Sequence, residues 1–128
     1  MRVLRYAGMW PLLGYGYWAI EHRETGEFAG EVGFADFKRE IEPPLGEVPE
    51  LGWALASRFH GRGYGTEAVR AALAWSDAYL DAAETVCLID PANRGSHRVA
   101  LKCGFRESHR ARFMGGETVV YRRARVTR

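Results

Sequence analysis

Apolar and polar positions alternate along this chain in a way that predicts several short strands and two amphipathic helices. A period of two is typical of strands that bury one face, and a period of three to four is typical of helices packed on a sheet. By these rules we expect strands at 15–21, 28–37, 51–56, 85–89, 105–108 and 118–123, and helices at 66–80 and from residue 95 or 96 to about 103. Strand, helix and strand in succession predict a right-handed crossover, and hence an α/β fold with a mixed sheet.

Glycine and proline mark the connections between these elements. Gly26 supplies the turn of an antiparallel hairpin between the first two strands. Residues 1–7 predict a short helical stub with Gly8 as its C-cap. The segment 38–49, which holds Pro43, Pro44 and Gly46, is expected to be an irregular loop. Without repeats or a linker, residues 1–128 predict a single domain.

The stretch from 51 to 80 predicts a strand, a glycine-rich loop and a helix. In the loop, Gly61, Gly63 and Gly65 alternate with His60, Arg62, Tyr64 and Thr66. Such a loop can hold an anion, because the first N–H groups of a helix lack partners and glycines let the backbone approach a phosphate. The spacing matches neither a P-loop nor a dinucleotide-binding turn. A flexible surface turn is the alternative interpretation.

A second stretch carries a further motif. After the strand that begins at Val86, the chain has Asn93-x-x-Ser96, a short helix, and then Lys102, Gly104 and Phe105. Together the two stretches resemble the GNAT superfamily of acetyl-CoA-dependent N-acetyltransferases, and most closely its ribosomal-protein N-acetyltransferase branch. The resemblance covers about 17–124. Its pyrophosphate-binding pattern, Gln/Arg-x-x-Gly-x-Gly/Ala, falls on residues 60–65, with His60 in place of Gln or Arg.

The resemblance implies a fold and a co-substrate. It implies a mixed, mostly antiparallel sheet with two splayed parallel central strands, helices on both faces, and an N-terminal strand and helices that are missing or shortened. Acetyl-CoA would be the co-substrate, and its pantetheine would lie between the splayed strands. The implied binding residues are Leu55, Ala56, His60, Gly61, Arg62, Gly63, Tyr64, Gly65, Thr66 and Asn93.

Transfer of acetyl to an amine needs a base and a proton donor for the leaving thiolate. We nominate Glu50 as the base, with Glu31, Asp36 and Glu47 as competitors; Glu50 could instead be a solvated residue at a strand end.

Many family members supply the proton from a tyrosine at the position that Ala100 occupies here. The ribosomal-protein branch is proposed to use a serine instead, which falls on Ser96, although a helix cap explains Ser96 equally well. Asn93 could likewise form an Asx turn, and Tyr121 is a fallback donor.

Charge is distributed unevenly along the chain. Residues 1–57 hold five Lys/Arg against nine Asp/Glu, and residues 94–128 hold ten against two, within a net charge of +2. A basic end suits an anionic ligand and an acidic end a cationic amine, although solvated surface charge would give the same counts.

The remaining features set limits on function. Cys87 and Cys103 predict buried, reduced thiols in a cytoplasmic protein. The four histidines show no metal-ligand spacing, and no apolar run could span a membrane. We therefore expect an N-acetyltransferase acting on a small-molecule or peptide amine, without metal, nucleic acid or membrane, with exposed sheet edges compatible with a homodimer. The alternatives are a non-catalytic acyl-CoA-binding regulatory module and, third, a nucleic-acid-binding protein.

Overall fold

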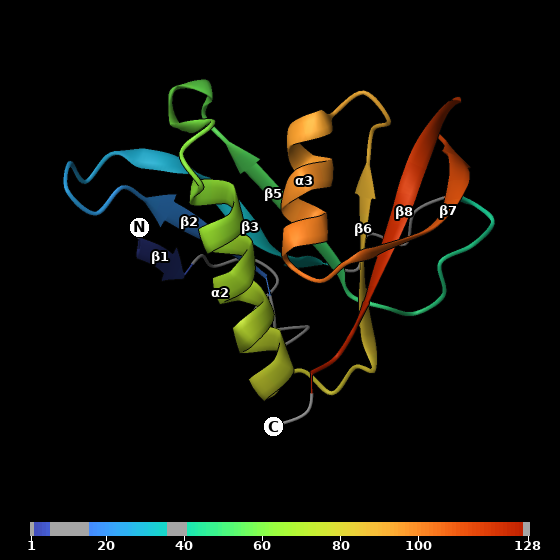
Figure 1. Ribbon diagram of the computed structural model, residues 1–128. Helices are drawn as coiled ribbons and strands as arrows, with labels where there is room; N and C mark the ends of the chain where they lie inside the picture. Colours follow the sequence, from blue (N-terminus) through green and yellow to red (C-terminus); the bar gives the residue numbers. More distant parts are fainter. Residues whose placement is uncertain (1, 6–15, 36–40, 127–128) are drawn as a thin grey trace.

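The computed structural model describes residues 2–5, 16–35 and 41–126, and these form one sheet with helices against it (Figure 1). Its eight strands stand in the order β1-β2-β3-β5-β6-β8-β7-β4. They are β1 (Arg2–Arg5), β2 (Tyr17–Glu21), β3 (Phe28–Ala35), β4 (Ile41–Glu42), β5 (Glu50–Leu55), β6 (Glu84–Ile89), β7 (Arg106–Phe113) and β8 (Gly116–Ala124). The helices are the 3-10 turn η1 (Ser57–Phe59), α2 (Tyr64–Tyr79) and α3 (Arg94–Lys102).

The sheet is antiparallel except where β5 meets β6. These two strands are parallel, and their register contains a single pair, Glu50 with Val86. The N–H of Val86 donates to the Pro49 carbonyl at 3.1 Å, and beyond this point the strands diverge. Figure 1 shows β5 and β6 spreading apart towards their C-terminal ends. The predicted fold class, a mixed sheet with two splayed parallel strands, is confirmed.

The main core lies between the sheet and the two helices. The buried stripe of α2 (Ala68, Val69, Ala72 and Leu73) packs with Val32, Phe34 and other strand residues. Trp75 of α2 lies edge-on to Trp18 of β2, with ring centroids 5.1 Å apart. Burial of this wide apolar stripe is what holds α2 on the sheet.

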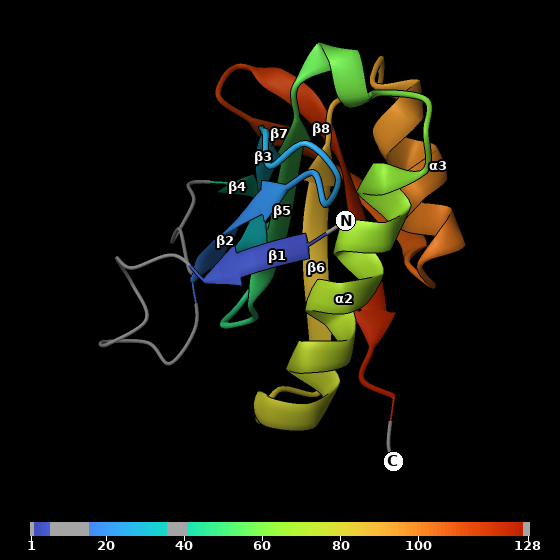
Figure 2. The same cartoon turned by 90° about the vertical axis from the view of Figure 1, so that its left-hand side faces the viewer.

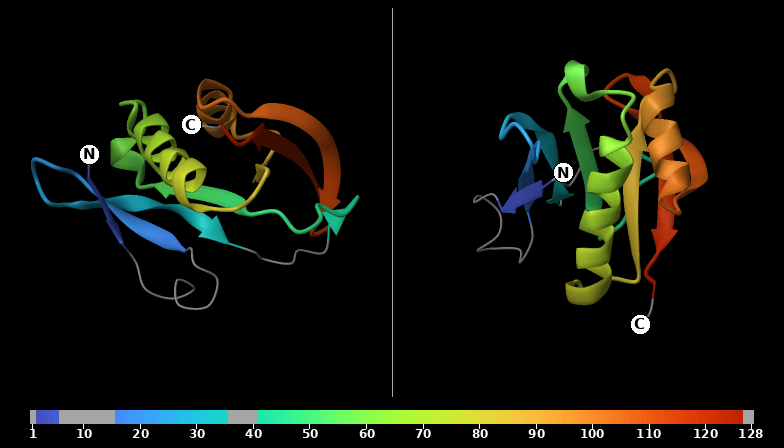
Figure 3. Two further views of the ribbon diagram at one scale, coloured as in Figure 1. Left: turned by 90° about the horizontal axis from the view of Figure 1, so that it is seen from below. Right: turned by 60° about the vertical axis from the view of Figure 1, so that its left-hand side comes forward.

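Among the described residues, both α2 and α3 lie on one face of the sheet, and not on both faces as the resemblance implied (Figure 3). We call the opposite side the far face. There a smaller cluster of Ile41, Ala111 and Val120 covers the β4–β7–β8 end. The helix face thus holds the larger core.

Two local predictions are wrong. The expected helical stub at 1–7 is a strand over residues 2–5, which pairs antiparallel with β2; Gly8 lies outside the described residues. The segment 38–49 contains the short strand β4, which pairs with β7 through Ile41 and Phe113. Both strands exist because a neighbouring edge offers backbone partners, which local sequence does not reveal. Figure 2 shows β1 beside β2.

The other elements occur where expected, with shifted ends. Strand β7 runs to residue 113 and joins β8 in a hairpin, so both strands are longer than the alternation predicted. The helix α2 begins two residues before residue 66, immediately after the glycine loop. No helix in the described ranges is long and apolar enough to cross a membrane.

Candidate functional site

The loop between β5 and α2 holds two glycines in the left-handed region. The φ angle is 75° at Gly61 and 81° at Gly63, where a side chain would be strained. A β-carbon at either position would meet no atom within 4 Å, so both glycines border open space. The first hydrogen bond into α2 runs from the N–H of Glu67 to the Gly63 carbonyl at 3.0 Å. The N–H groups of residues 64–66 therefore precede the helical ladder and can receive an anion.

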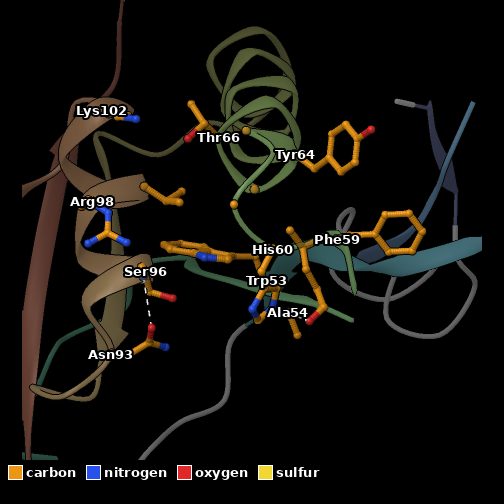
Figure 4. A pocket seen from close by; sticks show the side chains of 16 residues that line it. Trp53, Ala54, Phe59, His60, Tyr64, Thr66, Asn93, Ser96, Arg98 and Lys102 are labelled. Carbon is orange, nitrogen blue, oxygen red and sulfur yellow. Dashed lines mark hydrogen bonds between the residues drawn. The ribbon is translucent and has the colours of Figure 1, made fainter. Parts of the chain in front are cut away.

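A cleft with a volume of about 690 Å³ lies beside this loop (Figure 4). Ser96, Arg98 and Lys102 of α3 lie on one side of it, and Trp53 of β5 and His60 lie across from them. The cleft brings together most of the predicted binding and catalytic residues: Leu55, His60, Gly61, Gly63, Tyr64, Gly65, Thr66, Asn93 and Ser96.

The edge of β5 that borders the gap presents unused backbone groups. The Ala56 N–H donates to the Ala29 carbonyl at 2.8 Å, so the even-numbered positions of β5 bond to β3. In an antiparallel ladder the alternate residues, here Leu51, Trp53 and Leu55, point their N–H and C=O groups the other way. They point towards β6, which pairs with β5 only at its start. Among the described residues, the gap therefore has an open strand edge at Trp53, whereas the Leu55 carbonyl oxygen is engaged by His60.

His60 occupies the upper end of that edge. Its Nε2 lies 2.9 Å from the Leu55 carbonyl oxygen. A carbonyl only accepts, so Nε2 donates the hydrogen bond. The His60 side chain thus holds the glycine loop to the end of β5. Residues 61–66 that follow are called the glycine cradle below.

The α3 side of the cleft carries positive charge that the sequence motifs did not identify. Arg98 and Lys102 both line the cleft, four residues apart and so on one face of the helix. In the part of the chain that the structure describes, neither side chain forms an ion pair. Their spacing, in a helix next to a glycine loop, is a signal that could have found them.

The helix α3 is positioned by its own cap. Asn93 accepts a hydrogen bond from the Ser96 N–H at 3.1 Å and is the N-cap residue. The cap is thus Asn93, whereas the sequence offered a cap at Ser96 and an Asx turn at Asn93; the Asn93 side-chain oxygen is engaged. Ser96 itself is the third residue of the helix, where its hydroxyl lines the cleft.

A glycine cradle, an open strand edge and two cations would suit a ligand with phosphates and amide groups. The model of a family described as the acetyltransferase (GNAT) domain matches residues 2–106. This chain belongs to the GNAT acetyltransferase family. The predicted family is thereby confirmed.

Known proteins share both sequence and fold with this GNAT domain. The uncharacterized protein YkkB of Bacillus subtilis (strain 168) is 38% identical over 112 residues, which are 86% of this chain and 63% of that protein. This chain thus spans less than two thirds of the length of that curated relative. A solved structure from Bordetella pertussis, assigned to the GnaT acetyltransferases, is 34% identical with a TM-score of 0.82, over 91% of this chain and 70% of that one.

More distant structures show the fold alone. The ribosomal-protein-S5-alanine acetyltransferase of Vibrio fischeri is 17% identical, with a TM-score of 0.72 over 87% of this chain and 62% of that one. The aminoglycoside acetyltransferase AAC(6')-Ib, solved in complex with coenzyme A, is 18% identical, with a TM-score of 0.72 over 91% of this chain and 69% of that one. The neighbours of this GNAT domain thus include the ribosomal-protein branch.

Three predicted residues do not line the cleft. Arg62 is exposed and is not among the residues that line the cleft. Ala56 gives its N–H to β3, which leaves it no N–H for a ligand. Glu50 is only 7% exposed and lies where β5 and β6 still pair. Of the competing acids, Glu31 and Glu47 are exposed, and Asp36 lies outside the described residues.

Glu50 is on the far face of the sheet, at the base of the gap. Leu51 belongs to the core under the helices, so its neighbour Glu50 points to the opposite face. Burial first, and the nearby charge of Glu50 second, raise the pKa of the Cys87 thiol far above its usual value of 9.0. Cys87 therefore stays protonated, and burial raises the pKa of Cys103 as well. Both cysteines are free and buried, as predicted.

The Tyr121 side chain is buried and does not line the cleft. Its hydroxyl lies 2.6 Å from Nδ1 of His97, whose Nε2 lies 3.0 Å from the Asp90 carbonyl oxygen. Since that carbonyl only accepts, neutral His97 carries its proton on Nε2, and Nδ1 accepts from the tyrosine hydroxyl. Burial raises the pKa of Tyr121. The pair fixes α3 over β8 and is poorly placed to serve as a proton donor.

The described residues contain no cluster of His, Cys, Asp and Glu that could hold a metal ion.

Proposed function

We propose that this GNAT domain is an acetyl-CoA-dependent N-acetyltransferase, which moves the acetyl group from the thioester to a primary amine by direct attack. The observation that carries the proposal is the cleft, where left-handed glycines, helix N-terminal N–H groups and an open strand edge meet. The family supports acetyl transfer, and the reduced thiols suit a cytoplasmic protein. The amine acceptor, a protein N-terminus or a small molecule, is part of the proposal.

Each part of the cleft has a role in binding the co-substrate. The N–H groups between residues 61 and 66 would receive the pyrophosphate, because the backbone there is open and the helix dipole favours an anion. The edge groups of Trp53 would pair with the pantetheine amides as a further strand would. Arg98 and Lys102 would meet phosphate charge from the α3 side.

Chemistry would follow from holding the two reactants together. The nitrogen of a neutral amine attacks the thioester carbonyl carbon, the new C–N bond forms, and the C–S bond breaks. In this proposal Glu50 accepts the proton that the amine nitrogen loses, directly or through water. Ser96, which lines the cleft, donates a hydrogen bond to the leaving thiolate. The buried thiols take no part, since a protonated thiol is not a nucleophile.

The cradle can be tested with a pair of glycine variants. Gly63→Val should abolish coenzyme A binding in calorimetry, because valine does not tolerate a φ of 81° and the loop must change shape. Gly115→Val is the matched control, since Gly115 has a φ of 76° and equally open surroundings but lies in the β7–β8 hairpin. Unchanged affinity in Gly63→Val, or no heat for the wild type at millimolar coenzyme A, would contradict the proposal.

The second candidate function is a non-catalytic acyl-CoA-binding regulatory module. The observation that favours it is Ala100, which is fully buried at the position where many family members have the tyrosine that protonates the thiolate. This candidate requires coenzyme A binding without thiol release from acetyl-CoA for any amine. A thiol-release screen over a panel of primary amines separates the two functions.

A further inference from the structure

The hairpin that joins β2 to β3 reaches the glycine cradle through one histidine. His22 follows the end of β2, and two backbone hydrogen bonds of 2.8 Å close the turn there, from the His22 N–H to the Glu27 carbonyl and from the Gly26 N–H to the His22 carbonyl. Nε2 of His22 lies 2.9 Å from the hydroxyl oxygen of Tyr64, the first residue of α2. A residue 42 positions earlier in the chain thus contacts the cradle.

Hydrogen bonds on the other side of the imidazole ring settle which group donates. The Thr25 N–H donates to Nδ1 of His22 at 3.4 Å, and the Thr25 hydroxyl oxygen lies 3.2 Å from the same atom. A backbone N–H can only donate, so Nδ1 is an acceptor and the proton of the neutral imidazole is on Nε2. His22 therefore donates its hydrogen bond to the Tyr64 hydroxyl oxygen.

Three aromatic rings hold this contact in place. His22 stacks on Phe59 of η1, with centroids 5.5 Å apart and 27° between the ring planes, and Tyr64 lies edge-on to His22 at 5.5 Å. The centroids of Phe59 and Tyr64 are 6.0 Å apart, and Figure 4 shows both rings on the side of the loop away from α3. Because η1 precedes Gly61 and α2 follows Gly63, the three rings hold both ends of the glycine turn.

The contact matters because no capping side chain fixes the start of α2. The N-cap residue is Gly63, and no side-chain hydrogen bond caps the helix. Among residues 61–66, all of which the structure describes, Tyr64 is the only one whose side chain forms a hydrogen bond. Glycine adopts positive and negative φ about equally readily, so the glycines alone do not fix the direction of the chain. The direction of the N–H groups of residues 64–66 therefore depends on the hydrogen bond from His22.

We propose that His22 is a positioning residue for the co-substrate, whose hydrogen bond to Tyr64 holds the first turn of α2 so that the cradle N–H groups converge on the pyrophosphate. This role rests on the proposed function and belongs to a residue outside the cleft, since His22 is not among the residues that line it. His22 therefore acts through Tyr64, and its effect is on affinity for the co-substrate and not on the acceptor amine.

Two substitutions at His22 separate the hydrogen bond from the packing of the ring. His22→Phe keeps a ring to stack on Phe59 but loses the donor, and should weaken coenzyme A binding about fivefold, the effect of one neutral hydrogen bond. His22→Gln loses the ring but keeps an N–H donor, and should stay within about twofold of wild type. A packing role alone requires the opposite order. Calorimetry measures the dissociation constants, and the melting temperature of each free variant shows that it is folded.

Kinetics provide a readout that a general loss of structure would not give. In thiol-release assays with acetyl-CoA and the best amine of a panel, His22→Phe should raise KM for acetyl-CoA about fivefold and leave kcat and the amine KM unchanged. Tyr64→Phe should show the same loss, and the double variant no more than either single one, because each removes the same hydrogen bond. The matched control is His109→Gln on β7, where the histidine Nδ1 contacts Ser108; it should bind coenzyme A as wild type does.

The outcomes distinguish this role from the proposed function. Wild-type affinity in His22→Phe, or an equal loss in His22→Gln, would overturn the positioning role. A loss in Tyr64→Phe without one in His22→Phe would also overturn it, because the hydroxyl would then contact the co-substrate directly. Coenzyme A binding without thiol release would overturn acetyl transfer but not this role, which the dissociation constants still test. Absence of coenzyme A binding by the wild type would overturn both.

Discussion

Individual residues of the cleft act in two different ways. Gly61 and Gly63 act through backbone shape, since their φ angles expose N–H groups that a side chain would remove from position. Arg98 and Lys102 act through charge that no described acid neutralises. These two kinds of residue should respond differently to salt, because backbone hydrogen bonds are local and unpaired surface charges are screened.

The charge contribution can be measured at Arg98 and Lys102. Either Arg98→Ala or Lys102→Ala should weaken coenzyme A binding by roughly tenfold, because a hydrogen bond to a phosphate is worth about 1.5–3 kcal/mol. The loss should shrink as sodium chloride is raised. Calorimetry at low and high salt measures both effects. Arg112→Ala, an exposed arginine of β7, is the control; a similar loss there would mean that the effect is general electrostatics.

The role of Glu50 can be separated from binding. Glu50→Gln should lower kcat for acetyl transfer by about 100-fold or more, the usual contribution of a general base, and leave the dissociation constant of coenzyme A unchanged. Glu31→Gln and Glu47→Gln test the competing acids of the described strands and loops. The assignment of Glu50 is wrong if its variant keeps wild-type kcat, or if Glu47→Gln has the larger effect.

At the scale of elements, α2 is held at both ends. Its N-terminal turn approaches α3 and β5 through Gly65, where a β-carbon would lie 3.4 Å from the Val99 side chain. Its C-terminal end is tied to β8, because Asp77 accepts two hydrogen bonds from the Arg123 guanidinium at 2.9 and 2.8 Å. We call this contact the tether. It fixes the direction of α2, and therefore the direction in which the N–H groups at the N-terminus of α2 point.

The tether should make stability depend on pH. The hydrogen bonds from Arg123 hold the pKa of Asp77 below its usual value of 3.8. A carboxyl whose pKa is lowered by folding stabilises the folded state above its unfolded pKa, and this stabilisation is lost as the pH falls through the folded pKa. Asp77→Asn should therefore cost about 2 kcal/mol at pH 7, less than a fully buried pair would. Urea unfolding at pH 7 and below pH 4 measures the difference, which should shrink in acid; a constant difference would contradict this account.

The second helix is fixed by polar contacts more than by burial. Ala100 is the one fully buried residue of α3, and the Asn93 cap and the His97–Tyr121 hydrogen bond hold its first turn over the sheet. Because α3 forms a whole side of the cleft, these contacts decide how far its cations lie from the glycine loop.

At the scale of the whole molecule, the diverging pair β5 and β6 borders both faces of the sheet. The helix face carries the cradle and its cations, and Glu50 lies on the far face. A ligand in the cleft would bridge β5, α2 and α3, which otherwise meet through limited contacts. Binding should therefore stabilise the fold as a unit.

Coenzyme A should raise the melting temperature. Ligand at 100 times its dissociation constant adds about 2.7 kcal/mol to the folded state, which for a chain of this length is roughly 10 °C. Differential scanning fluorimetry measures the shift. Pantetheine, which lacks the phosphates, should shift the melting temperature little at the same concentration, because the cradle and the cations have no charge to meet. Equal shifts for both ligands would show that the glycine loop takes no part.

Several features of the site could be predicted from local sequence. The glycines after the strand at 51–56, with a helix behind them, specify an anion cradle because φ preferences and helix termini are local properties. The Asn93 cap is local in the same way. Arg98 and Lys102 were missed, because a basic residue on a helix is usually solvated; their four-residue spacing puts both on one side of the helix, and their neighbours across space show that this side faces a cleft.

The sequence by itself determined the order of the elements other than β1 and β4, the glycine cradle and the family, because periodicity, turn chemistry and motif spacing act between residues close along the chain. The tertiary structure decided which edges pair, as in β1 with β2 and β4 with β7, and which face each side chain meets. It placed both described helices on one face and Glu50 on the other, and it brought His22 to the first residue of α2. Those outcomes depend on register between strands far apart in the chain, and a shift of one residue would reverse every face.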